Sequence, residues 1–235
     1  MTTKRKLKIA ILMPTYKDIP VKFFMDLIAL QSRESNFFDL TYIIADSTIL
    51  VQARNILLEQ YFEYGPFDYG LFLDSDMAIP DDTISRLLTN NKEIVAGLFF
   101  TKSTIEPSFR VKTPEGKYAT PNSYPEDSLM EINATGLACV LIKDNVLQSI
   151  KNYCKDLPYF DTKYRSRNDF MGEDIYFFEL ISKLGFKVYM DSSVKVGHIG
   201  GIVDDRIYKA VKGSDIKDLG NWEKVKVIEA GGDIK

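Results

Sequence analysis

The chain has 235 residues, enough for one sizeable domain with a full hydrophobic core. Apolar residues make up 45% and charged residues 27% of the sequence, the usual composition of a soluble globular protein. The net charge of −3 excludes a broad basic surface, so we expect no nucleic-acid partner. No apolar run is long enough to span a bilayer, and the run at 9–13 is also too short for a signal peptide.

The two cysteines lack the spacing of a metal site. Cys139 lies inside an apolar stretch, where a thiol more often packs than reacts. We therefore expect a reducing cytoplasm as the compartment, with the protein either free or peripheral to a membrane.

Apolar runs alternate with amphipathic segments along the first half of the chain. The predicted elements are a strand at 8–13, a helix at 21–31, a strand at 40–45, a helix at 51–62, a strand at 71–73, a helix capped by Asp81 and Asp82, and a strand at 94–98. This alternation indicates a parallel sheet with helices on its faces. The helix at 21–31 is expected to pack on the sheet through Phe24, Leu27 and Ile28.

The second half of the chain is less regular. Residues 101–130 contain several prolines and charges, which predicts a long excursion over one edge of the sheet. The alternation resumes with strands at 138–142 and 187–190 and with helices at 145–153 and 173–184. Beyond residue 203 the sequence has mixed charge, so we expect one domain at 1–203 and a tail at 204–235 that is either a lid or an appendage.

Asp74 and Asp76 come directly after the buried strand at 71–73. Ligands bind at the carboxyl edge of an open α/β sheet, and two neighbouring carboxylates repel each other unless a cation lies beside them. Hard oxygen ligands suit a divalent ion that keeps positions for water or phosphate. Such a pair can instead form a helix-capping turn. Asp81 and Asp82 already supply that cap, so we favour a metal site.

Two further stretches carry groups suited to chemistry. Glu173 and Asp174 lie in the first turn of a predicted helix, where they either stabilise the helix dipole or take part in catalysis. Gly172 before them favours the second interpretation, because it lets a ligand approach closely. His198, the only histidine, stands near glycines at a strand end, and imidazole commonly joins carboxylates around transition metals.

Several stretches, taken in order, resemble a glycosyltransferase with the GT-A fold, similar to the family 2 group and to small viral and microbial relatives. They are residues 13–16, Ala53-Arg54-Asn55, Leu73-Asp-Ser-Asp76-Met, Gly172-Glu-Asp174 and Val196-Gly-His198. The resemblance implies a single α/β domain with a mixed, mainly parallel Rossmann-like sheet and helices on both faces. It also implies transfer of a sugar from a nucleotide-diphosphate donor, UDP in preference to GDP, to a hydroxyl of a glycan, lipid or protein acceptor.

The same resemblance implies a role for each candidate residue. Asp76 would bind the metal, Mn²⁺ or Mg²⁺, with His198 as a further ligand and Asp74 facing the ribose or a metal-bound water. Glu173 and Asp174 would offer a base to the acceptor hydroxyl, with Asp174 preferred. The donor would be bound by Pro14, Thr15, Tyr16, Asp46, Arg54, Asp74, Ser75 and Gly136. Family 2 enzymes often carry an arginine where this chain has Ile175-Tyr-Phe-Phe, so the anomeric outcome stays open.

Other functions use similar residues. A nucleotidyltransferase acting on sugar phosphates would carry a glycine-rich phosphate loop after the first strand, where this chain has Met-Pro-Thr-Tyr-Lys. A phosphatase of the aspartyl-phosphate type would place Asp-x-Asp on its first strand, followed by Gly-Thr. A non-catalytic sugar- or nucleotide-binding module stays open as an alternative, although it has no need of three metal ligands.

Overall fold

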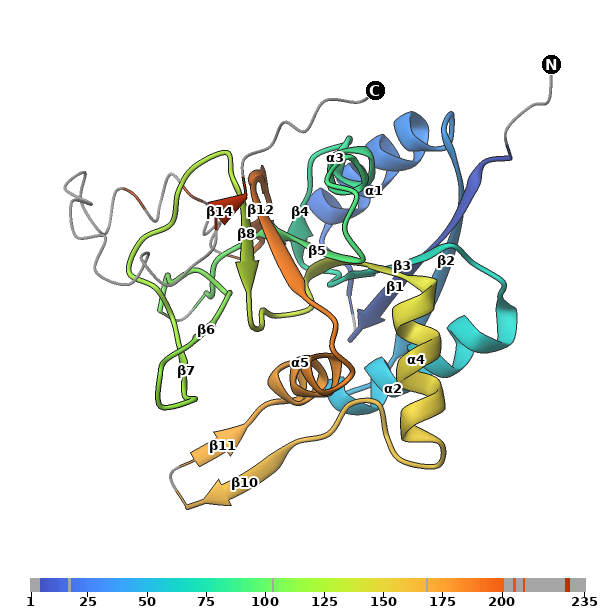
Figure 1. Ribbon diagram of the computed structural model, residues 1–235. Helices are drawn as coiled ribbons and strands as arrows, with labels where there is room; N and C mark the ends of the chain where they lie inside the picture. Colours follow the sequence, from blue (N-terminus) through green and yellow to red (C-terminus); the bar gives the residue numbers. More distant parts are fainter. Residues whose placement is uncertain are drawn as a thin grey trace.

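The computed structural model describes residues 5–16, 18–102, 104–167, 169–200, 205, 209, 227 and 228. Within these ranges the centre is an eight-stranded sheet with the order β14-β8-β12-β5-β9-β3-β1-β2 (Figure 1). Its strands are β1 (Leu7–Thr15), β2 (Phe38–Asp46), β3 (Tyr69–Leu73), β5 (Ile94–Leu98), β8 (Leu129–Ile132), β9 (Cys139–Lys143), β12 (Val188–Lys195) and β14 (Val227–Ile228).

Most of these strands run in one direction. The pairs β1–β2, β1–β3 and β5–β12 are parallel, whereas β9 lies antiparallel between β3 and β5. β8 is likewise antiparallel to both of its neighbours, β12 and β14. The sheet is therefore mixed and mainly parallel, which confirms the predicted fold class.

Helices cover both faces of the sheet, as Figure 1 shows. The described helices are α1 (Val21–Glu34), α2 (Leu50–Tyr64), α3 (Thr83–Thr89), α4 (Asp144–Cys154) and α5 (Glu173–Lys183). Because side chains alternate along a strand, Ile9 and Ile11 of β1 pack with the residues of α1 and α3, while Ala10 and Leu12 pack with those of α2, α4 and α5. The core thus consists of two apolar layers, one on each side of the sheet.

The buried face of α1 differs from the predicted one. Phe24 and Ile28 are exposed, whereas Phe23 and Leu30 are fully buried against the sheet and Leu27 is partly buried. The segment is apolar on nearly all sides, so helical spacing alone fits either choice of face. Tertiary packing decides between them.

Strand β1 continues past the point where the sequence predicted its end. The expected strand stopped at Met13, but Pro14 and Thr15 also pair with β2. The Thr15 carbonyl accepts a hydrogen bond from the Ser47 N–H, so Thr15 faces β2 and alternation turns Pro14 to the opposite side. Pairing with β3 ends at Leu12, and the missing N–H of the proline therefore costs no ladder bond.

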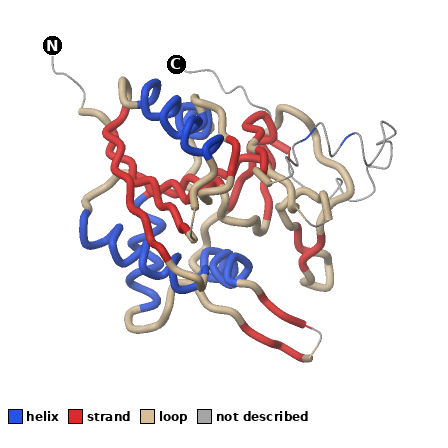
Figure 2. Tube along the Cα trace, turned by 180° about the vertical axis from the view of Figure 1, so that it is seen from behind, coloured by secondary structure: helices blue, strands red, loops and turns tan. Residues whose placement is uncertain are grey.

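Within the described part of the chain, three short antiparallel strand pairs lie outside the main sheet. A hairpin of β6 (Val111–Lys112) and β7 (Tyr118–Ala119) falls within the predicted excursion. A second hairpin, β10 (Lys163–Ser166) and β11 (Asp169–Met171), was not predicted and extends away from α5 (Figure 2). The third pair joins β4 (Met77–Ala78) to β13 (Gly197–His198).

The predicted tail at 204–235 contributes to the sheet. Val227 and Ile228 pair with Met130 and Leu129 of β8, whereas the tail's other residues, apart from 205 and 209, lie outside the described residues. The division into a domain at 1–203 and a tail stays a prediction. None of the described helices combines the length and the apolar character that a bilayer crossing requires.

Candidate functional site

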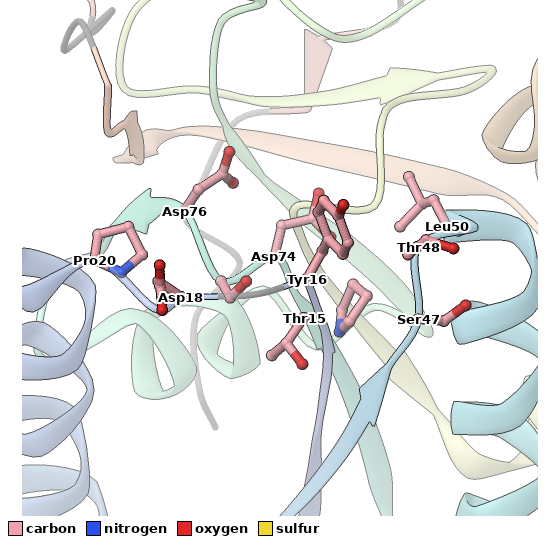
Figure 3. Close-up of a pocket in the computed structure, with 11 residues that line it drawn as sticks. Thr15, Tyr16, Asp18, Pro20, Ser47, Thr48, Leu50, Asp74 and Asp76 are labelled. Carbon is pink, nitrogen blue, oxygen red and sulfur yellow. The ribbon is translucent and has the colours of Figure 1, made fainter.

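The carboxyl ends of β1 and β3 meet at a cavity of about 370 Å³ (Figure 3). Parallel strands end at the same edge of a sheet, which is why residues far apart in sequence gather there. The predicted donor residues Pro14, Thr15, Tyr16, Asp74 and Ser75 line this cavity together with the predicted metal ligand Asp76. In Figure 3, Asp18 and Asp76 lie toward one side of it and Thr48 and Leu50 toward the other.

Three predicted donor residues, Asp46, Arg54 and Gly136, lie outside the described cavity lining. Asp46 ends β2 with an exposed side chain, and the residues just after it, Ser47 and Thr48, line the cavity instead. Gly136 lies nearer to α5, as described below. The sequence analysis missed Asp18, Ser47 and Thr48, although a short polar run after a strand at the binding edge is the signal that would have found the two hydroxyls.

The pairing of β4 with β13 brings His198 next to the aspartate pair. His198 lies opposite Met77 in this short ladder, and the Ile199 N–H donates to the backbone carbonyl of Asp76 at 2.8 Å. The segments after β3 and β12 therefore converge at one rim of the sheet, as the sequence predicts.

The ring of His198 is held in one orientation. Its Nδ1 lies 2.5 Å from the carbonyl oxygen of Phe100, and its ring contacts that of Phe99 edge to face, with centroids 5.7 Å apart. A carbonyl only accepts, so Nδ1 carries the proton and donates to it. The other nitrogen, Nε2, is then left as an acceptor in the neutral ring, which is the form that binds metal ions.

Asp76 has a cationic neighbour that the sequence analysis missed. The Lys102 Nζ lies 2.5 Å from the Asp76 Oδ2, and both side chains are 42% exposed. Among the residues that the structure describes, no three histidine, cysteine, aspartate or glutamate side chains gather closely enough to hold a metal. The predicted metal ligands Asp74, Asp76 and His198 therefore do not form a preformed cluster. Instead, Asp76 forms an ion pair with Lys102, and Asp74 forms one with Arg54.

Arg54 forms ion pairs with both acidic motifs, through Asp74 of the first and Glu173 of the second. Its guanidinium is almost completely buried, and Nη1 lies 2.6 Å from the Glu173 Oε1 while Nη2 lies 3.4 Å from the Asp74 Oδ1. Burial raises the pKa of Asp74, the charge of Arg54 opposes this rise, and the charge of Asp76 adds to it. Arg54 is absent from the described cavity lining and links the segment after β3 to α5, so its contact with the donor stays a prediction.

Asp174 lies in the first turn of α5, beside Gly136. Its Oδ1 accepts a hydrogen bond from the Ile175 N–H at 2.7 Å. A Cβ at Gly136 would lie 3.9 Å from the Asp174 Oδ2 and only 2.8 Å from the Cζ of Phe99, which leaves no room for a side chain. The predicted base and the predicted border of the sugar site thus lie together. Glu173 is instead occupied by its ion pair with Arg54.

Arg110 is a further charged neighbour that the sequence analysis missed. Burial lowers the pKa of Arg110, and the nearby charges of Asp174 and Glu106 oppose this. Its Nη1 donates to backbone carbonyls of residues 107–109, which fixes the guanidinium near the start of α5. The charge of Arg110 therefore lies close to the carboxylate of Asp174.

Comparisons with known proteins support the fold. No family model and no curated protein matches the chain. Among solved structures it is similar to A197 from STIV, with a TM-score of 0.52 and 20% identity over 82% of this chain and 85% of that one. It is also similar to GalNAc-T7, solved with UDP, GalNAc and Mn²⁺, with a TM-score of 0.53 and 10% identity over 84% of this chain.

The match covers 44% of GalNAc-T7, so this chain corresponds to less than half of that protein. Identities this low show likeness of fold alone. The chain has the Rossmann-like GT-A fold, a fold that it shares with a solved glycosyltransferase.

Proposed function

We propose that the chain is a metal-dependent glycosyltransferase that moves a sugar from a nucleotide-diphosphate donor to an acceptor hydroxyl. The observation that carries this proposal is the β4–β13 pairing, which sets His198 beside the backbone of Asp76 at the rim of the cavity. The cavity volume of about 370 Å³ falls in the range of small-molecule sites.

The charged side chains that line the cavity support the binding of a metal ion there. Asp18, Asp74 and Asp76 all line it, and no lysine or arginine is found among its described lining residues. A diphosphate would be repelled by these carboxylates unless a cation lay between them. Mn²⁺ is therefore the preferred ion and Mg²⁺ the second candidate, because a carboxylate together with a neutral imidazole suits Mn²⁺ better.

Asp76 and His198 would hold the ion. The carboxylate of Asp76 is 42% exposed beside Lys102, and the Nε2 of His198 has no hydrogen-bond partner among the described residues. Two protein ligands leave coordination positions for diphosphate oxygens and water, so a closed cluster of three side chains is not required. When bound, the metal neutralises the negative charge that develops on the departing diphosphate.

Asp174 is the proposed base. In the inverting form of the reaction, the acceptor oxygen bonds to the anomeric carbon, the bond from that carbon to the diphosphate breaks, and the hydroxyl proton passes to the Asp174 carboxylate. The carboxylate of Glu173 is already held in an ion pair with Arg54, which leaves Asp174 as the more available of the two. In a retaining reaction the two carboxylates would hold the sugar instead.

UDP is the favoured nucleotide, with GDP second. The exposed ring of Tyr16 offers a surface for stacking on a base, and the hydroxyls of Ser47 and Thr48 lie at the same cavity. GalNAc-T7 was solved with UDP and Mn²⁺, which makes this pair the first to test.

The test measures thermal melting by circular dichroism with UDP or GDP, each with and without MnCl₂. We expect UDP to raise the melting temperature only when Mn²⁺ is present. Asp76→Ala should abolish this rise, whereas Asp81→Ala, at an exposed aspartate paired with Arg33, should keep it. The proposal is wrong if neither UDP nor GDP changes the melting temperature of the unmodified protein when Mn²⁺ is present.

A further inference from the structure

A second cavity, of about 490 Å³, lies beside the start of α5. It is formed between the β6–β7 and β10–β11 hairpins, which project on the same side of the sheet in Figures 1 and 2. The lining residues that matter here are Lys117, Tyr118, Arg165, Phe170, Met171 and Ile175. None of its described lining residues also lines the first cavity, at the ends of β1 and β3, which is the proposed donor site and is called the donor cavity below.

This second cavity adjoins the proposed base. Met171 and Ile175 line it and flank the turn that carries Asp174, and the Ile175 N–H is bonded to the Asp174 carboxylate. On the other side, the ion pairs of Arg54 connect Glu173 to Asp74 in the donor cavity. The start of α5 therefore separates a cavity suited to the donor from a cavity that has no assigned ligand.

The walls of the second cavity combine aromatic surface with polar groups. Phe170 is 55% exposed, and its ring lies 5.0 Å from that of Tyr164 on the same hairpin. Across from it, the Tyr118 hydroxyl is buried and has no hydrogen-bond partner among the described residues. A buried hydroxyl without a partner is uncommon in proteins, and a bound ligand would supply one.

The cationic groups of the cavity have hydrogen-bonding capacity to spare. The Arg165 Nη2 lies 2.7 Å from the Glu179 Oε1, which fixes the guanidinium while most of its five donors remain for other partners. Lys117 adds an exposed ammonium group at the turn of the other hairpin. Such charged walls disfavour an acyl chain, which would have to desolvate them.

We propose that this cavity binds the acceptor and that the acceptor is a saccharide. A sugar ring presents a face of C–H groups, which packs on an aromatic ring such as Phe170, and a rim of hydroxyls, which bonds to Tyr118 and Arg165. The acceptor role rests on the proposed function, because it uses the adjacent Asp174 as base. Saccharide binding itself rests only on the cavity.

The test uses a panel of fluorescently labelled, neutral oligosaccharides of glucose, galactose, mannose and N-acetylhexosamines, and measures their binding to the full chain. We expect the protein to bind at least one of them, and we expect Phe170→Ala to weaken this binding by about tenfold or more. Tyr118→Phe, which removes only the hydroxyl, should also weaken it. The matched control is Phe37→Ala, because Phe37 is similarly exposed, at 60%, and also contacts a neighbouring aromatic ring.

Binding that falls in Phe170→Ala and persists in Phe37→Ala supports the proposal. The proposal is overturned if the unmodified protein binds no saccharide of the panel, or if Phe170→Ala binds as well as Phe37→Ala. Melting with UDP and Mn²⁺ on the same variants separates this outcome from the donor site. Saccharide binding without a nucleotide response would contradict glycosyl transfer and would still support a saccharide site at this cavity.

Discussion

The ion pairs of Arg54 give the sharpest prediction about the structure of the site. In Arg54→Met the two carboxylates of Asp74 and Glu173 lose their common cation, although both remain largely buried. Removing one partner from a buried charge pair costs about 3–5 kcal/mol. Because these carboxylates retain partial contact with solvent, we expect the lower end, about 3 kcal/mol of unfolding free energy, measured by urea unfolding followed by circular dichroism.

The matched control for this variant is Arg33→Met. Arg33 also pairs with two carboxylates, those of Asp81 and Asp82, but its side chain is 51% exposed. Surface pairs of this kind contribute about 0–1 kcal/mol, so this variant should unfold almost as the parent does. Adding Glu173→Gln to Arg54→Met should restore part of the loss. Equal losses in the two arginine variants would refute the buried-pair interpretation.

Three further predictions concern the base, the metal ligand and acid stability. Asp174→Asn should keep UDP and Mn²⁺ binding and lower UDP release from a UDP-sugar by about 10²–10⁴-fold, whereas undiminished turnover would remove it as base. His198→Ala should weaken Mn²⁺ binding at least about tenfold in a calorimetric titration with UDP present, and an unaltered titration would make the histidine structural. Hydrogen bonding to Arg5 holds the pKa of Asp68 below its usual range, so the pair adds stability above the unfolded-state pKa and loses it as the pH falls through the lowered one. Asp68→Asn should thus be less stable than the parent at neutral pH by about 1 kcal/mol, with the gap closing in acid, and a gap independent of pH would contradict this assignment.

Much of the sheet follows from the sequence because its strands are short apolar runs between clear breaks. Residues 94–98 and 139–142 are buried on both faces, and such runs are identified by composition alone. The β10–β11 hairpin was missed for the opposite reason. Nearly all its described residues are exposed, so no alternation of apolar and polar residues marks it as a strand pair.

The residues of the candidate site that lie at strand ends could be predicted from the sequence. Those brought in by ion pairs between distant parts of the chain could not. Asp74 and Asp76 follow directly from the strand before them. The ion pair of Arg54 with Glu173 joins residues 119 positions apart, and Lys102 reaches Asp76 from an irregular loop. Local sequence patterns hold no information about which cation faces which carboxylate. Asp46 shows the same limit at short range, because the residues that line the cavity begin one position later.

The most direct measurement is a crystal structure of the protein soaked with Mn²⁺ and UDP, with the metal located by its anomalous scattering. The account predicts one strong anomalous peak for a Mn²⁺ ion that is coordinated by the carboxylate of Asp76 and the Nε2 of His198. The diphosphate of UDP should bind the same ion. A metal bound elsewhere, or UDP bound without contact to either side chain, would contradict it.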